Sequence, residues 1–201
     1  MKNFNHGLKF KKSFENQCIK LIVEAYTQIL KDKSIQIDFM ENDITETLRT
    51  NVMNNPLKND WRIYISRDPV IPNPNAVVEK GFANKFKKVD LVMETYVSST
   101  QRAYSIEAKN LKEKDSALKR RYIETGIDSF IENKYPYGFL IGYLLEGGVV
   151  STIIGINKLL EKDGRTIEVL GKKEHKLVKH YYESNHAKLC LKHLIFDFTM
   201  L

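Results

Sequence analysis

Hydrophobic residues recur along the chain with two periods, one typical of helices and one typical of strands. Helical spacing predicts amphipathic helices at residues 13–31, 41–54, 114–133 and 149–160. A basic segment is also expected to be helical, at residues 172–184. Alternating or continuous apolar runs predict strands at residues 61–65, 89–96, 102–109, 137–145 and 189–198.

The connections indicate how these strands pair. A link of ordinary hairpin length, residues 97–101, predicts that the strands on either side of it are antiparallel neighbours. The helix at 114–133 precedes the apolar strand at 137–145, which favours a crossover connection and a parallel pair. We therefore expect one α/β domain over residues 1–201, with a mixed central sheet flanked by helices.

Charged residues interrupt two of the apolar strands. Asp90 lies near the start of one strand, and Glu107 and Lys109 share a face of the next because alternate residues point the same way. In an antiparallel hairpin these strand ends lie side by side, so the three side chains can converge. Two carboxylates and an amine in one place suit a hard divalent cation and an attacking water.

This constellation resembles the PD-(D/E)xK nuclease superfamily, which has the restriction-endonuclease-like fold. The family pattern is an Asp at the head of one strand, followed by Asp/Glu-x-Lys on the next, here Asp90 and Glu107-Ala108-Lys109. The residue before Asp90 is Val89, where the family pattern has proline. The resemblance implies an α-β-β-β-α-β core over about residues 40–145, with 146–201 as a carboxy-terminal extension.

The resemblance also implies roles for individual residues. Asp90, Glu107 and the backbone carbonyl of Ala108 would hold Mg²⁺ or Mn²⁺, and Lys109 would orient or help to deprotonate the attacking water. Many members present a Glu from the helix before the sheet, and Glu46 is the residue carried over to that role as a metal ligand. The alternative for Glu46 is structural, because it falls three residues after a good N-cap and completes a capping box.

Basic residues near these strands are candidates for contacts with phosphate groups. A basic loop before the first strand of the hairpin could hold phosphates at the mouth of a metal site, and the resemblance places further such residues around the start of the helix at 114–133. They are Lys87, Lys88, Lys112, Lys114, Lys119, Arg120 and Arg121. The alternative for each is a solvated surface charge.

Composition narrows the class of protein only slightly. The formal net charge is +7, which suits a polyanionic partner such as nucleic acid. Cys18 and Cys190 have no metal-binding spacing and are expected to be buried free thiols, which fits a reducing cytoplasm. No apolar run approaches membrane-spanning length. The four histidines of the last third show no metal spacing either and are expected to be structural or exposed.

Together these observations predict a cytoplasmic, metal-dependent endonuclease that hydrolyses DNA phosphodiester bonds, with DNA favoured over RNA. The resemblance places such a protein in restriction, anti-phage defence or DNA repair. The chain lacks an obvious sequence-reading domain, so a homodimer or a partner subunit of a defence complex is expected. The alternative is a module with the nuclease fold that binds nucleic acid or holds a complex together without catalysis.

Overall fold

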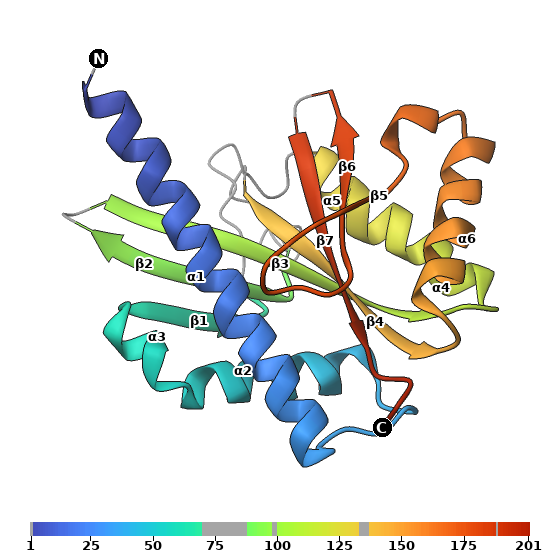
Figure 1. The fold of residues 1–201 in the computed structure, drawn as a ribbon, viewed down its shortest axis with the longest axis horizontal. Coiled ribbons are helices and arrows are strands. Elements are labelled where there is room, and N and C mark those ends of the chain that lie inside the picture. The colour runs from blue at the N-terminus through green and yellow to red at the C-terminus, as the bar shows by residue number, and fades with distance from the viewer. Residues whose placement is uncertain (1, 70–87, 98–99, 133–136, 188) are drawn as a thin grey trace, which may run out of the picture.

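The computed structural model describes residues 2–69, 88–97, 100–132, 137–187 and 189–201, with side chains from residue 11 onward except at Val97 and Thr100 (Figure 1). Its longest helix is α1 (Lys2–Asp32), followed by α2 (Glu41–Asn54) and the short α3 (Pro56–Asp60). A second helical run consists of α4 (Ser116–Arg121), a π-helical turn η2 (Tyr122–Ile127) and α5 (Asp128–Ile131). Further along are α6 (Val149–Lys162) and the 3-10 turn η3 (Thr166–Glu168).

One mixed sheet runs through the molecule in the order β1-β2-β3-β4-β7-β6-β5. Its strands are β1 (Ile63–Arg67), β2 (Leu91–Val97), β3 (Thr100–Lys112), β4 (Gly138–Glu146), β5 (Gly171–Lys173), β6 (Tyr181–His186) and β7 (Leu189–Asp197). The pair β2–β3 is antiparallel and the pair β3–β4 is parallel, which confirms both sequence predictions. The pair β4–β7 is also parallel, and the remaining neighbours are antiparallel.

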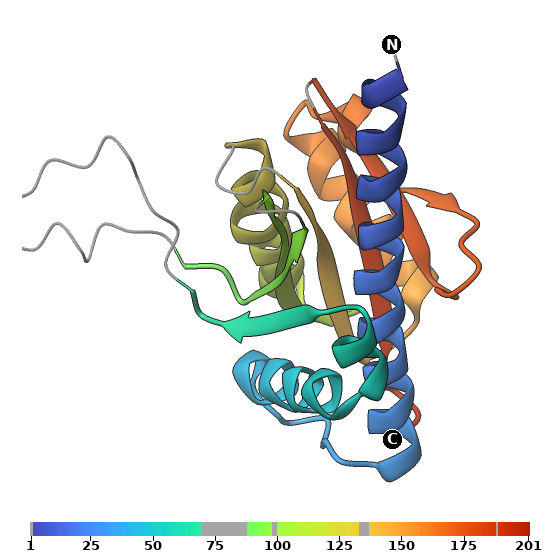
Figure 2. The ribbon, with the colours of Figure 1, turned by 90° about the vertical axis from the view of Figure 1, so that its left-hand side faces the viewer.

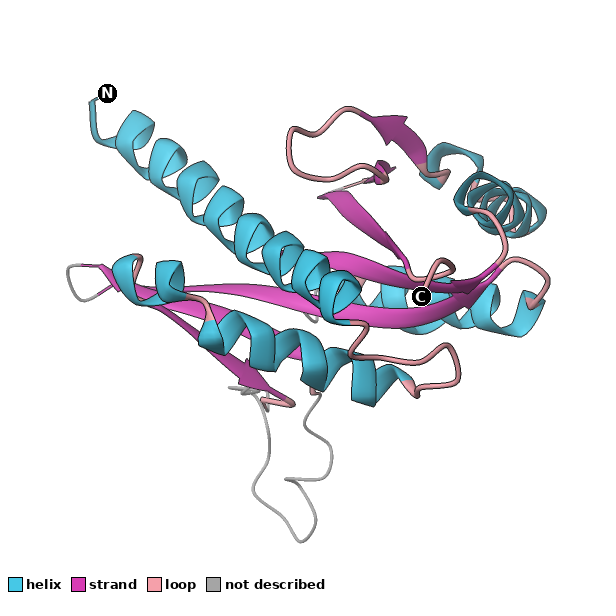
Figure 3. Ribbon diagram, turned by 60° about the horizontal axis from the view of Figure 1, so that its bottom comes forward, coloured by secondary structure: helices cyan, strands magenta, loops and turns pink. Residues whose placement is uncertain are grey.

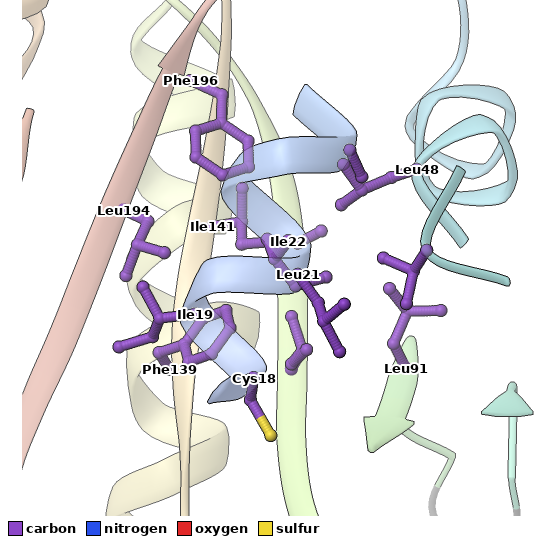
Figure 4. Close-up of a cluster of buried hydrophobic side chains, with 14 of the residues drawn as sticks. Cys18, Ile19, Leu21, Ile22, Leu48, Leu91, Phe139, Ile141, Leu194 and Phe196 are labelled. Carbon is purple, nitrogen blue, oxygen red and sulfur yellow. The ribbon is translucent and has the colours of Figure 1, made fainter. Parts of the chain in front are cut away.

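Helices cover both faces of the sheet (Figure 2). On one face α1 and α2 bury their apolar stripes against β2, β3, β4 and β7, and Figure 4 shows this core around Ile22, Leu48 and Ile141. On the other face η2, α5 and α6 pack on Leu111, Leu140 and Leu144. The α/β class and the flanked mixed sheet are therefore as the sequence predicts.

Several sequence predictions about elements are wrong. The segment 172–184 contains β5 and β6 instead of a helix, because β6 gains its backbone partners from β7, which the local pattern does not reveal. The first helix begins at Lys2 and not at residue 13. Cys190 is exposed, whereas Cys18 is buried as expected; neither forms a disulfide within the described residues.

Candidate active site

The site is built on the part of β3 that continues past its neighbour β2. Their pairing ends at Leu91 and Ile106, while β3 continues to Lys112. We call residues 107–112 the extended edge of β3. Along it, two backbone N–H groups donate to carboxylates: Ala108 to Asp90 Oδ2 at 2.7 Å, and Asn110 to Glu41 Oε2 at 3.0 Å.

The ammonium of Lys109 lies among four oxygen atoms at this edge. Lys109 Nζ is 2.7 Å from Glu107 Oε1 and 2.6 Å from the carbonyl oxygen of Ala108. It is 3.4 Å from Asp90 Oδ2 and 3.4 Å from Glu41 Oε1. The predicted proximity of Asp90, Glu107 and Lys109 is confirmed by these distances.

The cluster is largely withdrawn from water. The side chains of Lys109 and Glu107 are 4% and 10% exposed, and those of Glu41 and Asp90 are 11% and 21% exposed. Burial alone would lower the pKa of Lys109, but the carboxylates of Glu107, Asp90 and Glu41 outweigh it and raise that pKa above its ordinary value. The side chain is therefore an ammonium at neutral pH.

Glu41 is the acidic residue that sequence reasoning missed. It is the first residue of α2, where a negative charge is favoured by the helix dipole. Besides Lys109 and the Asn110 N–H, it accepts a hydrogen bond from Arg121 at 3.0 Å. The sequence does show an acidic residue at the start of the helix that precedes the sheet. The residues around it, however, do not indicate that this end of the helix contacts β3.

Glu46 lies apart from these contacts. Its carboxylate pairs with Arg49 at 2.7 Å and with Arg67 at 3.2 Å, and the hydrogen bond from Arg49 is the main cause that lowers its pKa to about 2. The capping box expected at Glu46 is wrong, because Asp43, at the third position of α2, accepts from the N–H of Met40 at 3.1 Å.

The candidate phosphate-binding residues differ in availability. Lys119 is buried and its Nζ donates to the carbonyl of Glu113, so the prediction that it contacts phosphate is wrong. Arg120 pairs with Asp163, and Lys112 lies 3.7 Å from Glu146.

Other basic candidates are closer to the surface. Lys88 and Lys114 are exposed. The side chain of Arg121 is 52% exposed while it contacts Glu41. Lys87 lies outside the described residues.

A chain of buried polar groups lies on the other side of β4. It runs from Tyr122 to His193 (2.9 Å), Ser184 (2.7 Å), His186 (2.8 Å) and Glu168 (2.9 Å). Because the carboxylate of Glu168 can only accept, His186 donates to it from Nδ1 and accepts a hydrogen bond from the Ser184 hydroxyl at Nε2. His193 must then donate from Nε2 to Ser184 and accept from the Tyr122 hydroxyl at Nδ1.

This chain is structural in character. Ser184 and His193 are fully buried, so the serine hydroxyl is not presented to a substrate. Burial, followed by the influence of His186, lowers the pKa of His193 to about 3, so the ring is neutral. Arg165 fixes the far end by pairing with Glu168 at 2.6 Å and with Asp128 at 2.7 Å. The expectation of a structural histidine therefore holds for His193.

The oxygen donors at the extended edge of β3 are of the kind that bind hard divalent cations. Three carboxylates and a carbonyl oxygen supply the oxygen ligands that Mg²⁺ prefers. Within the described part of the chain, however, no three His, Cys, Asp or Glu side chains are grouped as a ready-made metal site. The four oxygens instead surround the Lys109 ammonium, which would have to withdraw before a divalent cation could bind there.

Comparison with family models, with curated proteins and with solved structures gives no match for this chain. No described helix is both long enough and apolar enough to cross a membrane.

Proposed function

We propose that this chain is a metal-dependent endonuclease that hydrolyses phosphodiester bonds in DNA. The observation that supports the proposal is the convergence of Asp90, Glu107 and Glu41 on Lys109 at the extended edge of β3. Burying charges costs more free energy than most ion pairs return, so three acids packed around one amine are costly even where two of them also accept N–H groups of β3. Buried clusters of this kind are concentrated at functional sites.

In this proposal Asp90, Glu107 and the carbonyl of Ala108 hold Mg²⁺ or Mn²⁺, and Glu41 takes the part that sequence reasoning gave to Glu46. The cation, when bound, lowers the pKa of a water molecule and offsets charge on the phosphate. It would bind there in competition with the ammonium of Lys109, which lies within 3.4 Å of all three carboxylates.

In the free protein burial is outweighed by the carboxylates of Glu107, Asp90 and Glu41, which raise the pKa of Lys109, so the side chain is an ammonium. With the cation in its place among these acids, Lys109 would orient or help to deprotonate the attacking water, or offset charge in the transition state. Arg121, half exposed beside Glu41, is positioned to contact a phosphate oxygen next to the reacting one.

The test is plasmid cleavage with Mg²⁺ or Mn²⁺, compared with the same reaction in EDTA. We expect nicking by the wild type, and a loss of about a hundredfold or more in Lys109→Ala and Glu107→Gln. Lys158→Ala, which removes an exposed lysine of α6 outside the candidate phosphate-binding residues, is the matched control and should retain activity. Equal nicking by wild type and Lys109→Ala, or nicking that persists in EDTA, would refute the proposal.

A second candidate function is a nucleic-acid-binding or structural subunit with no catalysis of its own. It is favoured by the Lys109 ammonium, which already balances the carboxylates without any other cation. A gel shift with DNA by both wild type and Lys109→Ala, without cleavage by either, would support this alternative. Restriction, anti-phage defence and DNA repair are the settings in which we place either function.

A further inference from the structure

A separate cavity of about 260 Å³ lies between α1, the first part of β3 and Tyr137, the residue before β4. Its lining consists of Lys11, Phe14, Gln101, Arg102, Ala103, Tyr104 and Tyr137. Tyr104 precedes Ala108 by four residues along β3, so roughly 13 Å of strand separates the cavity from the carboxylate cluster. The two sites share none of the residues that line them.

Aromatic rings form much of the cavity wall. Phe14 and Tyr104 are buried and meet edge to face with ring centroids 6.5 Å apart, and Tyr104 lies 5.5 Å from Phe139. These contacts fix the inner rings in place. Tyr137 lines the same cavity and is 49% exposed, so part of its ring is accessible from solvent.

Positive charge accompanies the rings. Lys11 Nζ lies 3.4 Å from the centroid of the Tyr137 ring, a cation–π contact, and Arg102 lines the same cavity. Among the described residues that line the cavity there is no carboxylate. Glu15, which hydrogen-bonds Tyr104 from outside the lining, is paired with Lys192.

The basic character continues along α1 beyond the cavity. Between positions 2 and 12 this helix contains four lysines and no acidic residue. Figure 3 shows that this end of α1 projects away from the sheet. A ligand with several negative charges is therefore favoured over one with a single charge.

We propose that this cavity binds one unpaired base of a single-stranded nucleic acid, with the adjoining phosphates on Lys11, Lys12 and Arg102. Bases stack on aromatic rings without regard to sequence, and cations track the backbone on either side. A base within a duplex is already paired and stacked, so it cannot present a face to Tyr137. The volume is just below that of sites for drug-sized ligands, which suits one base. This inference does not depend on the proposed nuclease activity.

Fluorescence anisotropy of the full chain in EDTA tests the inference without cleavage. The probe is a short labelled single-stranded DNA oligonucleotide, with the same sequence as a blunt duplex for comparison. We expect Tyr137→Ala to weaken single-strand binding by about tenfold, and Tyr137→Phe, which keeps the ring, to restore it. Tyr64→Ala, at a tyrosine of similar exposure on β1, is the matched control and should have no effect.

The dependence of binding on salt concentration distinguishes phosphate contacts from base stacking. The loss in Lys11→Glu should shrink as salt rises, because it is electrostatic, whereas the loss in Tyr137→Ala should persist. Wild-type affinity in Tyr137→Ala, or an equal loss for the duplex, would overturn the inference. If a nucleoside monophosphate displaces the probe as well as unlabelled oligonucleotide does, the cavity is a site for free nucleotides and the strand assignment is wrong.

Discussion

Asp90 and Ala108 are joined by a 2.7 Å hydrogen bond from the backbone N–H of Ala108 to the Asp90 carboxylate. Asp90 directly precedes β2, where the backbone pairing between β2 and β3 ends. Its side chain therefore accepts a hydrogen bond from a β3 N–H that has no backbone partner in β2. Glu41 accepts the Asn110 N–H in the same way. The acids of the candidate site therefore also complete the edge of the sheet, and a substitution there affects both stability and chemistry.

Two variants of Asp90 separate these effects. Asp90→Asn keeps an oxygen that can accept the Ala108 N–H but removes the charge, so we expect a folded protein with about a hundredfold less cleavage. Asp90→Ala also leaves the N–H without its partner, at a cost of about 1–3 kcal/mol in the free energy of unfolding. Urea unfolding and plasmid cleavage measure the two quantities. Full cleavage by Asp90→Asn would show that the charge has no role.

Glu41 and Glu46 form a natural matched pair on α2. Glu41→Gln should reduce cleavage by about tenfold or more, because it removes a carboxylate within 3.4 Å of Lys109 Nζ. Glu46→Gln should leave cleavage unchanged, since its carboxylate contacts Arg49 and Arg67. Cleavage rates at saturating Mg²⁺ compare the two. The opposite ranking would restore the role that the sequence suggested for Glu46.

Lys109→Met provides a test of cation binding that does not need activity. Removing the ammonium leaves the three acids facing one another, and breaking a buried ion pair costs about 3–5 kcal/mol. A divalent cation that binds there stabilises the folded state by mass action, so Mg²⁺ or Mn²⁺ should raise the Tm of the variant more than that of the wild type.

The matched control for this cation test is Lys112→Met. Its ammonium lies 3.7 Å from Glu146 near the surface, so its Tm and its response to the cation should resemble those of the wild type. An equal cation response in Lys109→Met and wild type would count against a metal site at the extended edge of β3.

The part of the site that lies on one hairpin could be predicted from the sequence. Strand alternation places Glu107 and Lys109 on one face, and the short link brings Asp90 beside them, so local rules suffice. Glu41 could not be found in this way. It reaches Lys109 across 68 residues of sequence, and only the docking of α2 on the sheet determines which of its acids points at β3.

The same limit explains the missed strand β6. Apart from two tyrosines its sequence, YYESNH, is polar, and its order comes from pairing with β7 and from burial of Ser184 in the polar chain with His193. Neither contact leaves a periodic pattern of hydrophobic residues. The π-helical turn η2 is likewise invisible in the apolar stripe at 114–133, which continues through it.

The buried polar chain predicts loss of stability in acid. The pKa of His193 falls from 6.5 to about 3, so between these values the unfolded chain binds a proton that the folded chain does not. The free energy of unfolding should therefore decrease as pH falls below 6.5, by about 1.4 kcal/mol per pH unit for this histidine. His193→Gln can still accept and donate hydrogen bonds but does not titrate, so its free energy of unfolding should depend less steeply on pH. His175→Gln, at a half-buried histidine outside the buried polar chain, should change this pH dependence less. Urea unfolding from about pH 6.5 to about pH 4 measures these slopes, and equal slopes for wild type and His193→Gln would show that His193 does not carry the effect.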